Sequence, residues 1–150
     1  FFCSIGGFDT HGDEQLGRQA ELLREINDAV VAFNGAMAEL GTWHDVTLFS
    51  ASDFGRTFTS NGKGSDHGWG THQFVMGGAV KGGQIHGRFP QLVVGGPDDS
   101  GNQGNWIPTT SVESYAATLS RWFGASSTVL ADAFPNLGHF DADAGFVTFA

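Results

Sequence analysis

The sequence contains one cysteine, few cations and no apolar run of the ~18–20 residues needed to cross a membrane. The single cysteine, Cys3, excludes an internal disulfide framework and a zinc site made only of cysteines. Seven Lys and Arg residues against sixteen Asp and Glu residues give a formal charge of −9. Such an acidic chain lacks the positive charge for sequence-independent binding to nucleic acid or to an acidic membrane surface. We therefore expect no nucleic-acid partner and no membrane span.

The sequence also lacks Gly-x-Ser-x-Gly and any glycine-rich loop that ends in Gly-Lys-Ser or Gly-Lys-Thr. These absences exclude the corresponding serine hydrolases and P-loop nucleotide-binding proteins. The chain is 40% hydrophobic, with 14 Phe and 4 Trp residues, and this content suits a folded core. Its 150 residues predict a single domain, residues 1–150. Because the chain opens on what reads as a strand, we expect it to be a fragment that lacks an N-terminal portion.

The strongest periodic pattern predicts a long amphipathic helix of about seven turns. Asp13 is the expected N-cap, and Gly41 is placed to end the helix. Apolar residues recur at steps of three, four and seven, which places them on one helical face: Leu16, Leu23, Ile26, Val30, Phe33, Met37 and Leu40.

A second helix is expected to begin near Thr110 and to stop at Gly124. Thr110 and Glu113 have the spacing of a capping box, in which each side chain satisfies a backbone N–H of the first turn.

Four short β-prone runs surround these helices, at residues 2–8, 46–51, 74–76 and 92–94. Residues 46–51 show no polar alternation, which favours a strand covered on both faces, as in a parallel sheet. Strand, helix and strand in succession form a βαβ unit with a right-handed crossover. The sequence thus predicts an α/β protein with a mainly parallel sheet flanked by helices. We expect Cys3, inside the first strand, to be buried and inert.

Carboxylates and imidazoles gather after the expected strands. In an open α/β sheet, ligands bind at the carboxyl ends of the strands. A mixture of oxygen and nitrogen donors suits Zn²⁺, Mn²⁺ or Fe better than Ca²⁺ or Mg²⁺. We therefore predict a site for a divalent metal, Zn or Mn before Fe, Ca or Mg. Its candidate ligands follow the first and second strands or belong to the glycine-rich loop that begins at Ser52: Asp9, His11, Asp53, Asp66, His67 and His72. The glycines on both sides of His67 would let the backbone approach a small ion.

Each candidate also has a plainer interpretation. Asp9 is a good turn residue, Asp53 is able to cap a loop, and His72 is able to hydrogen-bond a ligating carboxylate instead of the metal. Arg56 is the candidate catalytic cation, since its guanidinium could hold an anionic oxygen or pair with a nearby carboxylate. The remaining histidines have no acidic neighbours at useful spacing, apart from Asp45 and Asp141 in expected surface turns. We expect them to be structural.

Several of these stretches resemble the DUF1501 family. They occur in the order Gly6–Gly12, Ser52–Thr57, Gly64–Gly70, Phe74–Gly83 and Thr109–Gly124, ahead of Phe134–Leu137. The resemblance implies the C-terminal part of an alkaline phosphatase-like or sulfatase-like fold. It also implies export through a twin-arginine signal, and hence a periplasmic or secreted protein.

The resemblance implies a distribution of ligands over two metals. Asp9 and His11 resemble the start of one metal motif, at a shorter spacing than the family's usual Asp-x-x-x-His. Asp53 stands where an Asp-His pair is expected, with Phe54 in the histidine position, and His67 resembles the last histidine of the first metal. A second alignment makes Asp66 and His67 the pair and His72 the last ligand. We favour the first alignment because Asp53 directly follows a strand.

Three functions follow. The first is the metal-binding C-terminal half of an exported, metal-dependent hydrolase of phosphate or sulfate esters, whose missing N-terminal half supplies the nucleophile. Its partner is a small anionic ester, and the fragment alone is expected to be inactive. The second is a catalytically degenerate scaffold or polysaccharide-binding protein, suggested by Phe54. The third, a calcium-dependent carbohydrate binder, is suggested by Asp98, Asp99 and Asn102 in one loop.

Overall fold

The computed structural model describes residues 1–12 and 15–148, and the chain divides into two compact units. Each unit is assembled from three stretches that are far apart in sequence. The first contains Phe1–Trp43, Ser52–His72 and Gln91–Ile107, and the second contains His44–Ala51, Gln73–Pro90 and Pro108–Ala150.

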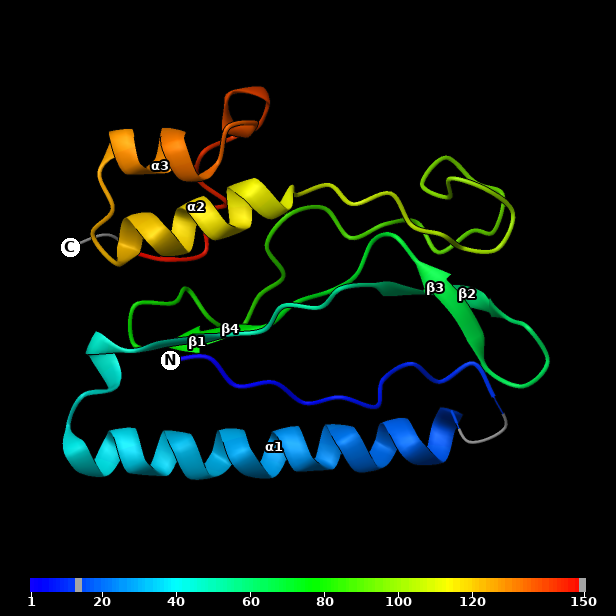
Figure 1. Ribbon diagram of the computed structural model, residues 1–150, viewed down its shortest axis with the longest axis horizontal. Coiled ribbons are helices and arrows are strands. Elements are labelled where there is room, and N and C mark those ends of the chain that lie inside the picture. The colour runs from blue at the N-terminus through cyan, green and yellow to red at the C-terminus, as the bar shows by residue number, and fades with distance from the viewer. Residues whose placement is uncertain (13–14, 149–150) are drawn as a thin grey trace. The chain divides into compact units, whose positions relative to one another are not determined.

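The first unit is built on the long helix α1, Gln15–Leu40. This helix confirms the one predicted from the apolar repeat, and Gly41 ends it at a φ of +70°, a conformation that glycine adopts without strain. Asp13, the expected N-cap, lies outside the described residues. The N-terminal segment runs beside α1 (Figure 1). The amide of Gln19 donates to the Thr10 hydroxyl at 2.8 Å, and this bond ties the segment to the helix.

The strand predicted at residues 2–8 is wrong. These residues form no strand, and Cys3 is exposed rather than buried. An apolar run becomes a strand only if another strand satisfies its backbone hydrogen bonds. Here the segment lies against the side of α1 instead: a Cβ on Gly7 would stand 3.5 Å from the Leu22 side chain.

The glycine-rich stretch that we expected to be a loop is an antiparallel hairpin. Strand β2, Gly55–Ser60, pairs with β3, Ser65–Gly68, and Arg56 stands directly opposite His67. Gly68 is required by this pairing, because a Cβ there would lie 2.7 Å from the Arg56 backbone. The hairpin thus places two predicted functional side chains next to each other.

In the second unit, one helix packs against a short antiparallel pair of strands, and a second helix packs on the first. Strand β1, Thr47–Phe49, pairs with β4, Val75–Gly77, and both lie where the sequence predicted strands. Its helices are α2, Val112–Trp122, and α3, Ser127–Ala133, with a 3₁₀ turn at Leu137–His139. Another 3₁₀ turn, Trp43–Asp45, begins on a residue of the first unit and ends in the second. The core of this unit consists of Leu119, Phe146 and Val147.

The predicted mainly parallel sheet is wrong. Within residues 1–12 and 15–148, the strands form two separate two-stranded antiparallel sheets, so the proposed βαβ unit does not exist. The predicted alkaline phosphatase-like fold is wrong for the same reason, because it requires a large parallel sheet. The run at residues 92–94 is not a strand either: its chain turns, and the Val93 amide donates to the carbonyl oxygen of Gln91.

The cap of α2 differs from the prediction by one residue. Ser111, not Thr110, is the N-cap, and its hydroxyl accepts the backbone N–H of Ser114 at 2.9 Å. Gly124 follows the helix at a φ of +104°, as its predicted role as terminator requires. Among the described residues, no helix is both long and apolar enough to span a membrane.

The only tyrosine of the sequence, Tyr115, gives a direct test of this unit. Its hydroxyl donates to the Ser50 carbonyl oxygen at 2.9 Å, and its ring contacts Phe49 and Phe146. Burial disfavours the phenolate and raises the pKa of Tyr115 from 10.0 to about 12.

We expect the near-ultraviolet phenolate absorbance of the folded protein to rise with a midpoint of about pH 12. In denaturant the midpoint should return to about 10. Between these values the folded state holds the proton that the unfolded state has lost, so the free energy of unfolding should decrease as the pH rises. A midpoint near 10 in a chain with native circular dichroism would contradict the burial of this ring.

Candidate metal centre

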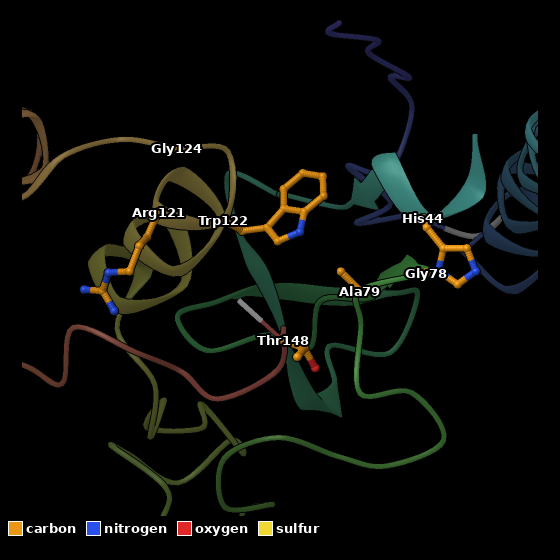
Figure 2. Close-up of a pocket in the computed structure, with 7 residues that line it drawn as sticks. All are labelled: His44, Gly78, Ala79, Arg121, Trp122, Gly124 and Thr148. Atoms are coloured by element: carbon orange, nitrogen blue, oxygen red, sulfur yellow. The ribbon is translucent and has the colours of Figure 1, made fainter. Parts of the chain in front are cut away.

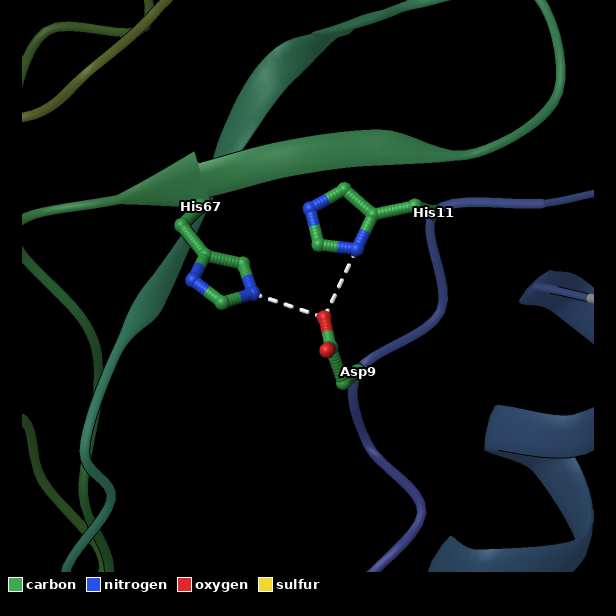
Figure 3. A group of neighbouring side chains, drawn as sticks. All are labelled: Asp9, His11 and His67. Carbon is green, nitrogen blue, oxygen red and sulfur yellow. Dashed lines mark hydrogen bonds and ion pairs between the residues drawn. The ribbon is translucent and has the colours of Figure 1, made fainter.

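Three of the predicted ligands meet in the first unit. One oxygen of Asp9, Oδ1, lies 2.7 Å from Nδ1 of His11 and 2.7 Å from Nε2 of His67. Figure 3 shows the carboxylate and both imidazoles pointing toward one another, with His67 on the hairpin and the other two on the N-terminal segment. The potential ligand atoms of the three residues all lie within 4.8 Å of one another.

Arg56 holds the hairpin and the N-terminal segment together. Its side chain lies on the same face of the hairpin as that of His67, because residues directly opposite each other on paired strands share a face. Its two terminal nitrogens donate to the carbonyl oxygens of Ser65 and Phe8, and one of them lies 3.5 Å from Oδ1 of Asp9. This guanidinium therefore fixes the backbone next to the cluster and adds positive charge beside the carboxylate.

The environment of Asp9 favours its ionised form. The hydrogen bond from His67 has the largest effect and lowers the pKa of the Asp9 carboxyl below its usual value; desolvation opposes it, and the charges of His11, His67 and Arg56 add to the lowering. Asp9 is therefore a carboxylate at neutral pH, the form in which it can bind a metal.

The three donors fit a small divalent cation after a slight separation. A tetrahedral Zn²⁺ with bonds of about 2.0–2.1 Å sets its ligand atoms about 3.3 Å apart, against the 2.7 Å of the two contacts to Asp9. The side chains of Asp9, His11 and His67 are 63%, 46% and 44% exposed, so small shifts of these side chains would not disturb a core. Three protein ligands leave a coordination position open, which is typical of catalytic rather than structural sites.

The other predicted ligands stay outside this group. Asp53 and His72 are exposed, and neither joins the three-residue cluster within the described part of the chain. Asp66 accepts the Asn61 amide at 2.9 Å, and the same amide reaches the carbonyl oxygen of His11 at 3.5 Å. Asp66 thus supports the loop that carries His11.

Sequence reasoning missed the role of Asn61, and it treated Phe54 only as a departure at a ligand position. Asn61 lies in the hairpin turn, a position from which nothing in the sequence links it to His11. The Phe54 ring stacks on the His67 imidazole, with ring centroids 3.9 Å apart and planes 4° from parallel. The sequence does offer one sign of this role: Phe54 is two residues before Arg56, and residues two apart along an extended chain lie on the same face.

A hollow of about 590 Å³ adjoins the cluster at Arg56. Phe58 and Trp106 form its aromatic wall, their ring centroids 5.7 Å apart, and Lys63 lies at the hairpin turn. Arg56, which lies 3.5 Å from Asp9, lines this hollow, whereas among the described residues none of the three donors does.

The second unit has a separate hollow of about 520 Å³. Figure 2 shows Arg121 and His44 at opposite ends of it, with Trp122 between them, so its two basic side chains do not converge on one ligand.

The loop with Asp98 and Asp99 is organised by its own backbone. The two oxygens of Asp99 accept the N–H groups of Gly95, Gly101, Gly104 and Asn105, and these bonds lower its pKa to about 2. Asp98 accepts the N–H of Gln91 at 2.7 Å. The carboxylates suggested as calcium ligands are therefore already used to hold the loop.

A family model matches residues 1–101, which include every residue of the cluster, its supports and most of the adjoining hollow. The description of that family is "Protein of unknown function (DUF1501)". Neither a curated protein nor a solved structure matches the chain.

Proposed function

The chain belongs to the DUF1501 family, and from that premise we propose that Asp9, His11 and His67 bind one divalent metal ion in a hydrolase of phosphate or sulfate esters. One observation carries the proposal: three donor atoms from two separate stretches of chain converge to within 4.8 Å. The donor set, one carboxylate oxygen and two imidazole nitrogens, favours Zn²⁺ or Mn²⁺.

The ion would supply the Lewis acidity that stabilises negative charge on a phosphoryl or sulfuryl group. The chain supplies the surroundings. Asp9 and the two imidazoles hold the charge in place, and Arg56 keeps the segment and the hairpin in register through its bonds to Phe8 and Ser65. Arg56 therefore acts as a positioning residue in this proposal, while the hollow beside it receives the organic part of the ester. We further propose that the nucleophile comes from another part of the protein and that the protein is exported.

A second candidate, a secreted scaffold or polysaccharide-binding protein, is favoured by the state of Arg56. Both terminal nitrogens of this side chain already donate to main-chain carbonyls, so it is poorly placed to bind a substrate anion. In this alternative the three donors stabilise the fold, and the aromatic wall of the hollow, Phe58 and Trp106, binds a sugar ring.

Metal binding and ester turnover separate the two candidates. We expect metal-free protein to bind about one equivalent of Zn²⁺ or Mn²⁺ per chain in calorimetry, because the three donors form one site. The metal-loaded, full-length protein should hydrolyse an aryl phosphate or an aryl sulfate, and a chelator should stop the reaction. Absence of both Zn²⁺ and Mn²⁺ binding would end the metal proposal, whereas binding without turnover of either ester would favour the scaffold.

A further inference from the structure

Phe54 and His67 form a stacked pair at the edge of the cluster. The near-parallel rings, 3.9 Å apart, belong to the residue just before β2 and to β3. On the cluster side, the His67 ring lies 4.7 Å from the His11 ring at an angle of 34°. The Arg56 guanidinium lies 5.1 Å from the centre of the Phe54 ring. Phe54 is half-buried, so the ring against which His67 rests is itself held by its surroundings.

The stack replaces a hydrogen bond that metal-binding histidines usually have. A ligating imidazole almost always donates its second N–H to a carboxylate or a carbonyl, which fixes the plane of the ring. Nε2 of His67 faces Asp9, and within residues 1–12 and 15–148 no hydrogen bond reaches its Nδ1. The imidazole is 44% exposed, so few other contacts limit its rotation. Besides its bond to Asp9 and the nearby His11 ring, the face of Phe54 is the contact that limits this rotation.

We propose that Phe54 is a positioning residue, which orients the His67 imidazole for binding a divalent cation together with Asp9 and His11. This inference rests on the proposed metal site. The Phe54 ring, stacked flat on the imidazole, restricts rotation of the imidazole about its Cβ–Cγ bond while leaving Nε2 directed at Asp9. Because the His67 imidazole is already oriented, less conformational entropy is lost when the ion binds, and the affinity for the ion increases.

Two substitutions at one position test the role of the ring. Phe54→Leu keeps an apolar side chain but removes the aromatic face, and Phe54→Tyr keeps the face. The loss of a group that orients a metal ligand typically costs about 10–100-fold in affinity. We expect Phe54→Leu to weaken Zn²⁺ binding about tenfold in competition with a chromophoric chelator. Phe54→Tyr should bind within about twofold of the unchanged protein, because the stack survives.

A second readout needs no metal. In the metal-free protein, the ring protons of His67 should resonate upfield because they lie over the Phe54 ring. That shift should disappear in Phe54→Leu and persist in Phe54→Tyr. Phe58→Leu is the matched control, since it makes the same change on the same hairpin at a residue that packs on Trp106 instead. It should change neither the His67 resonances nor the Zn²⁺ affinity.

The outcomes distinguish this inference from the proposal beneath it. If the unchanged protein binds neither Zn²⁺ nor Mn²⁺, the metal site fails, and with it the role of Phe54 toward a cation, whatever the ring shift shows. If it binds Zn²⁺ and Phe54→Leu binds equally well, only the role of Phe54 is overturned. If Phe54→Leu fails to fold, Phe54→Met is judged by the same two measurements, because it also removes the ring.

Discussion

Replacing His67 with alanine is expected to weaken Zn²⁺ binding by at least about a hundredfold, because losing even a residue that only orients a ligand costs about 10–100-fold. The substitution removes one of three donors, and the two that remain lie on the same short segment, at Asp9 and His11. The measurement is competition with a chromophoric chelator at neutral pH. Circular dichroism should stay native, because the His67 side chain is nearly half exposed.

His72→Ala is the matched control for this prediction. It removes an imidazole from the same unit and at a similarly exposed position, but His72 does not join the cluster. We expect its affinity to stay within about twofold of the unchanged protein, as for an exposed side chain that makes no contact with the ion. A large loss for His72→Ala and a small one for His67→Ala would contradict the cluster and support a site built around His72.

The part of the site that was predictable from sequence is the local part. Asp9 and His11 are two residues apart after an apolar run, so their proximity follows from their spacing. His67 is 58 residues from Asp9, and its candidacy came from the Asp-His sequence in a glycine-rich stretch and from the family resemblance. Asp53 was included for its place after a strand, but the chain turns at that point and enters β2. Its position relative to the cluster depends on that turn.

The long helix and the errors in the sheet have the same origin. An amphipathic helix satisfies its own backbone hydrogen bonds, so the repeat that ends at Leu40 was sufficient to predict α1. A strand needs a partner, and local sequence does not say which one. The run at 46–51 reads as a strand of a parallel sheet, yet it pairs with β4 in antiparallel order, Leu48 opposite Met76.

The glycines around His67 have a different role from the one that the sequence predicts. The glycines around His67 were expected to let the backbone approach an ion. Instead, Gly68 lets β3 approach the Arg56 backbone, and Gly55 stands directly opposite it on β2. The absence of side chains at this pair closes the hairpin, which brings Phe54, Arg56 and His67 onto one face. The glycines serve the site indirectly, through strand pairing.

Leu22→Ala should lower the free energy of unfolding of the first unit by about 2–5 kcal/mol, the usual cost of a cavity at a fully buried leucine. Leu22 is 0% exposed on α1, and its side chain packs beside Gly7, two residues before Asp9. Urea denaturation followed by tryptophan fluorescence measures the change, since Trp43, Trp69 and Trp106 belong to this unit. Zn²⁺ affinity should also decrease, because the segment that carries two of the three donors loses its support on the helix.

Leu23→Ala separates packing from helix propensity. It makes the same substitution on the same helix, but Leu23 is 59% exposed, so no cavity forms and the free energy of unfolding should change by less than about 0.5 kcal/mol. The apolar repeat of the sequence places Leu23, but not Leu22, on the apolar face of the helix. Equal destabilisation by the two variants would contradict the packing of the N-terminal segment on α1. If Leu22→Ala alone lowers both the free energy of unfolding and the Zn²⁺ affinity, the metal donors of this segment depend on a side chain that the apolar repeat does not identify.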